Sequence, residues 1–145
     1  MSLQWNGNGA VDIRYLRAGP WPAAVLGIEV QGMTDHKTLR ACLQRIGDEF
    51  DGLREERASM TGPPDARQLF TDEKLRRASE RWWSTLACIA VREANDLDDL
   101  RILADTVLVL HDRPMSPYDH PGSSRSVELR RLAVTLANGV LALSQ

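Results

Sequence analysis

Cysteine is scarce in this chain of 145 residues, and the chain has no long apolar run. The two cysteines, Cys42 and Cys88, are too few for a disulfide framework, which is typical of smaller chains with more loops. We interpret them as buried free thiols in a reducing compartment. No stretch reaches the roughly 18 apolar residues that a membrane span needs, and no signal peptide opens the sequence. We therefore expect a cytoplasmic protein with no membrane partner.

The sequence also lacks the short motifs that mark common classes of catalytic site. It contains no Gly-x-Ser-x-Gly nucleophile motif, no Walker-type phosphate loop, no Cys-x-x-Cys pair and no His-Glu-x-x-His zinc motif. The glycine-containing segment 6–9 is close to the N-terminus and has no strand before it, so it does not fit a dinucleotide loop. We predict no cofactor and favour a non-catalytic protein.

A strong excess of either charge is absent too. The net charge is −2 and the isoelectric point is near 5.9, so nothing attracts the whole chain to nucleic acid or to an anionic membrane. Segment 76–83 does combine three arginines with two tryptophans, as proteins that bind single strands can. Glu73 and Glu80 dilute that charge. A nucleic-acid-associated regulator is therefore only our third hypothesis.

What the sequence does contain is a long helical pattern in a chain of one-domain size, residues 1–145. Residues 71–112 include no proline and have the densest apolar content. Spacings of three and four place a set of apolar side chains on one face of a helix over 71–94. This set consists of Leu75, Ala78, Trp82, Leu86 and Ile89. We predict that this face is the inner wall on which the other helices pack.

Three further helices are predicted around that wall, over about 35–60, 96–112 and 124–143. Each has apolar residues at helical spacing and a residue at its start that can cap it. Thr71 is the predicted N-cap of the 71–94 helix, and Leu69-Phe70 before it is a predicted hydrophobic staple. The fold class is therefore mainly α, a four-helix bundle-like domain with its helical core at 34–145.

The N-terminal part, residues 1–33, shows a different pattern. Apolar residues alternate with polar ones in 11–17, and a second alternation follows in 23–31. We prefer a small β-hairpin of these two segments, and a short helix at 22–31 is the alternative. A lone hairpin is marginally stable in water. This hairpin or arm must therefore lie on the helices or pair with another chain.

The 96–112 helix and Trp83 offer more apolar surface than three neighbouring helices would cover. The 96–112 helix is apolar nearly all round, and its mixed face includes Ile102 and Val109. Trp83 lies beside the inward-facing Trp82, at the edge of the core or in an interface, where tryptophan is enriched. We predict Trp83, Ile102 and Val109 as partner-binding residues.

Histidine and aspartate gather at only one place, at the two ends of the irregular loop 113–124. His111, Asp112, Asp119 and His120 are candidate ligands for a divalent metal, because imidazole and carboxylate groups suit such ions. The two pairs are separated by a proline-containing loop. Surface histidines and aspartates around a turn are the alternative interpretation.

Two resemblances to helical enzyme families involve the same loop. His111-Asp112 resembles the dipeptide of HD-type phosphohydrolases, which also need an upstream histidine and a distant aspartate. His36 is the only upstream histidine here, and Asp119 is the only acidic residue in the loop beyond. Arg113 and His120, with six residues between them, resemble the Arg-spacer-His motif of HEPN-type ribonucleases. That resemblance implies a catalytic pair in which His120 is the acid or base and Arg113 stabilises phosphate charge, although this spacer holds two prolines.

Taken together, these patterns favour a non-catalytic helical module for protein interaction or assembly that acts as a homo-oligomer. Its expected partner is a second copy of itself, and another protein is possible. The alternative is a helical enzyme or a ligand- or metal-binding domain that uses the 111–120 loop.

Overall fold

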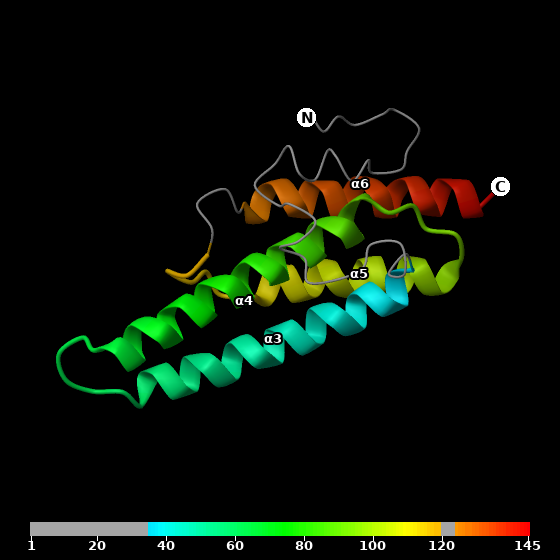
Figure 1. The fold of residues 1–145 in the computed structure, drawn as a ribbon. Coiled ribbons are helices and arrows are strands. Elements are labelled where there is room, and N and C mark those ends of the chain that lie inside the picture. The colour runs from blue at the N-terminus through cyan, green and yellow to red at the C-terminus, as the bar shows by residue number, and fades with distance from the viewer. Residues whose placement is uncertain (1–34, 120–123) are drawn as a thin grey trace, which may run out of the picture.

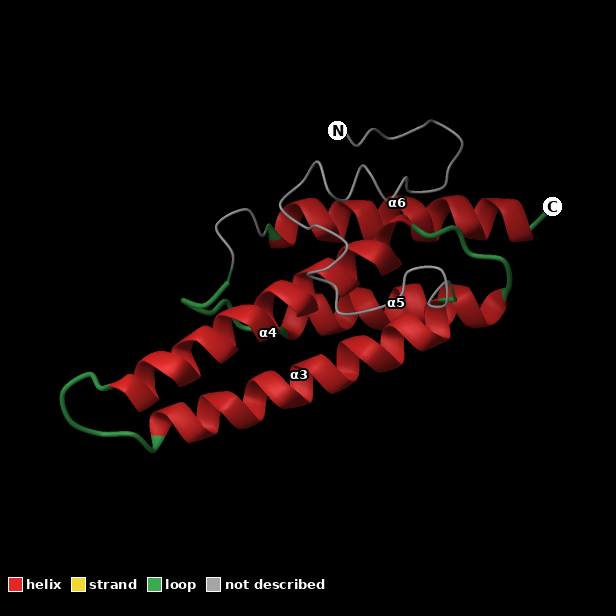
Figure 2. Ribbon diagram, in the orientation of Figure 1, coloured by secondary structure: helices red, strands yellow, loops and turns green. Residues whose placement is uncertain are grey.

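A computed structural model describes residues 35–119 and 124–145 of the chain. Within them it contains four helices: α3 (His36–Ala58), α4 (Ala66–Val91), α5 (Leu97–Asp112) and α6 (Arg125–Leu143) (Figure 1). The described part has no strand (Figure 2), which confirms the mainly α prediction. The hairpin expected for 11–17 and 23–31 lies outside the described residues, as does His120.

The helices are arranged so that α4 and α5 both lie between the other two. α3 packs against α4 and α5, and α6 packs against the same two helices. α3 and α4 form a long side-by-side pair joined by a short connection (Figure 1). None of the four described helices has the length and apolar content of a transmembrane span.

Polar side chains fix where each helix begins. Asp35, Asp65, Asp96 and Ser124 each accept a hydrogen bond from the backbone N–H three residues later. Such caps satisfy one of the backbone donors that a helix start leaves unpaired. The predicted starts of α3, α5 and α6 are confirmed within one or two residues.

The predicted start of α4 is wrong. The helix begins at Ala66 rather than at Thr71, because Asp65 follows two prolines and its side chain caps Gln68 N–H at 2.8 Å. Thr71 is buried inside the helix, where its hydroxyl donates to the carbonyl of Arg67. Leu69 and Phe70 are not a staple before the helix; they lie within α4 and are exposed.

We expect Asp65→Ala to lower the free energy of unfolding by about 1 kcal/mol, because it removes the N-cap of α4. Urea unfolding followed by circular dichroism measures this loss. Thr71→Val is the control, since it removes the hydroxyl that would act as the cap if the helix began there. A larger loss from Thr71→Val than from Asp65→Ala would contradict the observed start.

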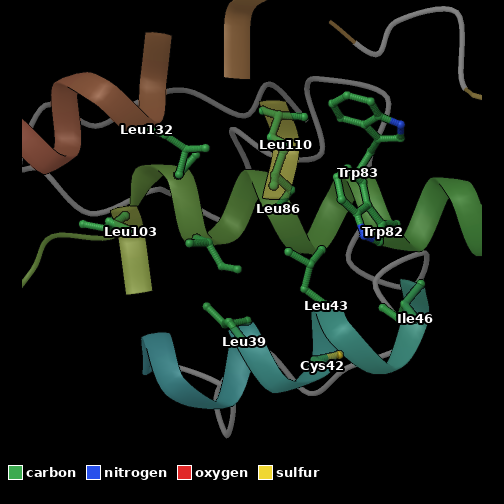
Figure 3. Packing of buried hydrophobic residues seen from close by; sticks show 12 residues of the cluster. Leu39, Cys42, Leu43, Ile46, Trp82, Trp83, Leu86, Leu103, Leu110 and Leu132 are labelled. Atoms are coloured by element: carbon green, nitrogen blue, oxygen red, sulfur yellow. The ribbon is translucent and has the colours of Figure 1, made fainter. Parts of the chain in front are cut away.

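The core is organised around the face of α4 that the sequence predicts. Trp82, Leu86 and Ile89 are buried and meet side chains from all three other helices (Figure 3). These partners are Leu39, Leu43 and Ile46 of α3, Leu103 and Leu110 of α5, and Leu132 of α6. A smaller cluster at the other end of α4 unites Leu75 and Ala78 with Phe50 of α3. The predicted inner wall is confirmed.

The helix α5 is less enclosed than its apolar sequence suggests. Its buried residues are Leu103, Thr106 and Leu110, which occupy one face. Leu97 and Leu108 are exposed. Only one face of α5 therefore packs into the core.

Candidate functional site

The loop after α5 folds back onto the helices through one buried ion pair. Arg113 donates to both carboxylate oxygens of Asp119, at 3.1 and 3.2 Å. The two side chains are only 13% and 5% exposed. Ser79 and Trp83 of α4 also donate to Asp119, at 2.8 and 3.1 Å, and so does the backbone N–H of Ser116. These contacts anchor the end of the loop to the middle of α4.

Aromatic rings enclose the other side of this ion pair. The guanidinium carbon of Arg113 is 4.3 Å from the ring centre of Trp82 and 5.5 Å from those of Trp83 and Phe50. A cation over aromatic faces at these distances is attracted by the ring quadrupoles, more strongly when water is excluded. We call Arg113, Asp119, Trp82, Trp83 and Phe50 the arginine box.

A second anchor holds the same loop to the far end of the helix pair. The hydroxyl of Tyr118 donates to Asp72 of α4 at 2.8 Å, and Arg57 of α3 donates to the same oxygen at 2.8 Å. The Tyr118 ring meets Phe50 edge to face, with centres 6.4 Å apart. Residues 113–119 thus tie α3 and α4 together.

The protonation of these carboxyl groups follows from their hydrogen bonds. Burial tends to raise the pKa of Asp119, but the hydrogen bonds from Arg113, Ser116 and Ser79 outweigh it and the pKa is lowered. Hydrogen bonds from Tyr118 and Arg57 lower the pKa of Asp72 in the same way. Burial raises the pKa of the Tyr118 hydroxyl. Asp119 is therefore ionised and fully engaged at neutral pH.

The structure separates the residues that the sequence groups as metal ligands. His111 and Asp112 are exposed and contact each other, with Nδ1 and Oδ1 3.1 Å apart. Asp119 is turned toward α4 and is engaged with Arg113. Within 35–119 and 124–145, no three His, Cys, Asp or Glu side chains gather closely enough to hold a metal ion. His120 lies outside the described residues.

The upstream histidine that an HD-type site would use lies elsewhere. His36 is buried at the start of α3, where its ring nitrogens face the carbonyl of Arg92 at 3.0 Å and the carboxylate of Asp99 at 3.4 Å. Asp99 and His111 are near opposite ends of α5, about 18 Å apart along its axis. His36 therefore cannot ligate the same ion as His111.

The cysteines are free, and neither is placed as a nucleophile. Cys42 is buried in the main core, and Cys88 packs against it. Burial raises the pKa of the Cys88 thiol to about 12. The reactive thiolate form is thus disfavoured at neutral pH.

A cavity of about 260 Å³ lies beside the arginine box, between α3 and the end of α5. Its ionisable lining residues are Arg40, Arg54, Arg113, Asp48, Asp51 and Asp112. Positive and negative groups are balanced there, and Arg40 is already paired with Asp105 at 2.6 Å. The volume is also below the range typical of small-molecule sites. The balance of charge favours no ligand of either sign.

The predicted partner-binding residues divide into one that is covered and two that are partly open. Trp83 is 2% exposed, because its indole N–H reaches Asp119 and its ring lies in the arginine box, so it offers no surface to a partner. Ile102 and Val109 are half-buried, and Val109 packs against the core. Their role as contacts stays a prediction.

A line of exposed apolar residues lies instead on α6. Val127, Val134 and Leu141 are 42%, 53% and 65% exposed. They are spaced by seven residues, so they form one line along the helix, which we call the α6 stripe. Val127, Val134 and Leu141 are not among the residues that the sequence predicts to bind a partner. The seven-residue spacing was the signal that could have revealed the stripe.

Comparison with protein-family models, with curated proteins and with solved structures finds no match.

Proposed function

We propose that this chain is a non-catalytic helical interaction module that assembles with a second copy of itself through the α6 stripe. The observation that carries this proposal is the exposure of Val127, Val134 and Leu141 on one line of α6. Exposed apolar residues on one side of a helix favour an interface, and a spacing of seven residues returns each of them to the same side.

The polar residues beside the stripe, Arg130 and Asn138, fit a second copy as the partner. When two α6 helices cross antiparallel with Val134 at the centre, Val127 of one copy meets Leu141 of the other. Arg130 then meets Asn138, whose side-chain carbonyl can accept a hydrogen bond. A parallel arrangement would place Arg130 against Arg130, where like charges repel. The stripe is thus self-complementary in the antiparallel sense that a two-fold dimer requires.

The alternative of a catalytic loop has weaker support. Arg113 and Asp119, the residues best suited to chemistry in the described part of the loop, are paired with each other, and aromatic rings cover the guanidinium group of Arg113. A side chain that binds a substrate must be accessible to that substrate. The arrangement of these two side chains favours a structural role.

The alternative of nucleic-acid binding also lacks an exposed surface. Trp82 and Trp83, the aromatic part of the predicted segment, are buried. Arg76 and Arg77 pair with Glu73, and Arg81 pairs with Glu49 at 3.1 Å. Bases need exposed rings on which to stack. The ion pairs of the three arginines and the burial of the two tryptophans favour an ordinary solvent-exposed helix face over a binding site for nucleic acid.

We expect Leu141→Asp to weaken self-association at least about tenfold, because it places a charge in the apolar contact. Sedimentation velocity of the full chain at several concentrations measures the change. Leu108→Asp is the matched control, since Leu108 is 62% exposed but lies on α5. Equal effects of the two substitutions, or none from Leu141→Asp, would exclude the stripe as the interface.

A further inference from the structure

The cavity of about 260 Å³ beside the arginine box is bordered by a polar group that the fold leaves unpaired. This group is the indole N–H of Trp82, a residue that is only 4% exposed. No acceptor among residues 35–119 and 124–145 takes a hydrogen bond from it. A buried donor without a partner is unfavourable. The N–H of Trp82 is therefore available to an acceptor on a molecule in the cavity.

This N–H group opens into the cavity on the side of α3. A Cβ added at Gly47 would lie 3.6 Å from Nε1 of Trp82, and both residues line the cavity. Nε1 is also not among the fully enclosed unpaired polar atoms of the described chain. A glycine inside a helix is less favourable than an alanine. At position 47 the missing side chain leaves space in front of the indole N–H.

Two arginines of the cavity wall are already engaged with carboxylates outside it. Arg113 pairs with Asp119, and Arg40 pairs with Asp105. Neither aspartate lines the cavity. These two guanidinium groups are thus neutralised by their own partners and do not call for an anion in the cavity.

The other charged side chains of the wall are of both signs. Arg54 and Asp51 are exposed and form no ion pair with a described residue. Asp48 and Asp112 each have one oxygen engaged by a neighbouring polar side chain. Side chains of a helix lean toward its N-terminus, so Arg54 and Asp51 lean toward position 47. The rim near the indole N–H therefore offers a guanidinium and carboxylates together.

We propose that this cavity binds a small zwitterion of the free amino acid class. Its carboxylate accepts a hydrogen bond from Trp82 and lies toward Arg54, and its ammonium group lies toward Asp48 and Asp51. A ligand of both signs fits a lining whose formal charges balance. The volume range typical of small-molecule sites refers to drug-sized ligands, and a free amino acid is smaller. Apolar residues of the wall can cover its carbon atoms, and they include Leu43, Phe50, Val109 and Pro114.

The cavity is separate from the proposed interface between two copies. No residue of α6 lines it. Binding of a zwitterion therefore goes beyond self-association and does not depend on it, and failure of one proposal would leave the other standing.

Nuclear magnetic resonance of the full chain tests the proposal through the indole N–H signal of Trp82. Each common L-amino acid is added in turn to about 10 mM, where millimolar binding is measurable. We expect at least one of them to shift this signal in a saturable manner, because the N–H gains a hydrogen-bond acceptor. Acetate and methylammonium each carry only one of the two charges, and they should bind at least about tenfold more weakly.

Gly47→Ala should weaken this binding at least about tenfold, because its methyl group occupies the space in front of the indole N–H. Gly52→Ala is the matched control. Gly52 lies on the same helix outside the cavity, and a Cβ there meets nothing within 4 Å. Both changes replace a glycine inside a helix by alanine, so both chains should be at least as stable as the parent in urea unfolding.

Three results would overturn the proposal. The Trp82 signal could remain unshifted by every amino acid, which would leave water as the partner of the N–H. Gly47→Ala could bind as tightly as Gly52→Ala. Acetate or methylammonium could bind as tightly as the amino acids, which would assign the cavity to a ligand of one charge. Saturable binding of an amino acid that Gly47→Ala weakens and Gly52→Ala retains supports the zwitterion site.

Discussion

Asp119→Ala should lower the free energy of unfolding by about 3 kcal/mol, the lower end of the range for breaking a buried ion pair. The substitution leaves the Arg113 guanidinium unpaired among aromatic rings, and it removes the acceptor for Ser79 and Trp83. We choose the lower end because Arg113 retains some contact with solvent. Urea unfolding at neutral pH gives the value.

Asp112→Ala is the control for this prediction. Asp112 is an aspartate too, but it is the last residue of α5 and is exposed. Its effect should stay within about 0.5 kcal/mol. Similar losses from the two substitutions would mean that the ion pair does not anchor the loop.

The pH dependence of the Asp119→Ala effect follows from the lowered pKa of Asp119. Burial works against ionisation, but hydrogen bonds from Arg113, Ser116 and Ser79 hold the pKa below its ordinary value of 3.8. A depressed pKa contributes stability that is present above the unfolded value and is lost as the pH falls through the folded value. The difference between parent and variant should therefore be constant from neutral pH to about 4 and shrink below it. A difference that shrinks between pH 7 and 5 would contradict this account.

Trp82→Ala should lower the free energy of unfolding by about 3–5 kcal/mol, as large-to-small changes of a buried aromatic do. Trp82 is buried in the main core, packs against Trp83 and carries the guanidinium of Arg113 on its ring. Its loss thus leaves a cavity and uncovers a charge. Thermal and urea unfolding, followed by circular dichroism, measure the loss.

Phe70→Ala serves as the matched control, because Phe70 lies on the same helix but is exposed. Its effect should be within about 0.5 kcal/mol. A Trp82→Ala chain as stable as the Phe70→Ala chain would show that α4 does not form the inner wall. Because Trp82 and Asp119 belong to one box, the losses from Trp82→Ala and Asp119→Ala should not simply add.

The helices were predictable from the sequence because their signals are local. The spacing of Leu75, Trp82 and Leu86 identifies the buried face of α4, and Asp35 and Asp96 mark two helix starts within a few residues of the pattern they cap. The error at the start of α4 has a local cause as well. Thr71 and Asp65 are both good caps, and only the contacts of the folded chain distinguish a buried threonine from a capping aspartate.

The arginine box was not predictable, because it depends on residues that are distant in sequence. Trp83 is buried in the main core, and its indole N–H donates to Asp119, 36 positions later in the sequence. Sequence periodicity predicts helices and strands, but it does not predict which helix an irregular loop will contact. The sequence therefore assigned Arg113 and Asp119 to possible chemistry and Trp83 to an interface.

The α6 stripe was missed for another reason. The helix has two apolar lines, one through Leu129, Leu132 and Leu136, and one through Val127, Val134 and Leu141. Spacing identifies both lines but not which of them faces the core. The neighbours of α6 decide this, and they bury Leu132 while the second line stays open.

The most direct test of the proposed assembly is sedimentation equilibrium of the full chain, from low micromolar to near-millimolar concentration. The account predicts a mass of two chains that falls toward one chain on dilution, with the Leu141→Asp variant at one chain where the parent is still paired. A mass of one chain at every concentration would contradict it.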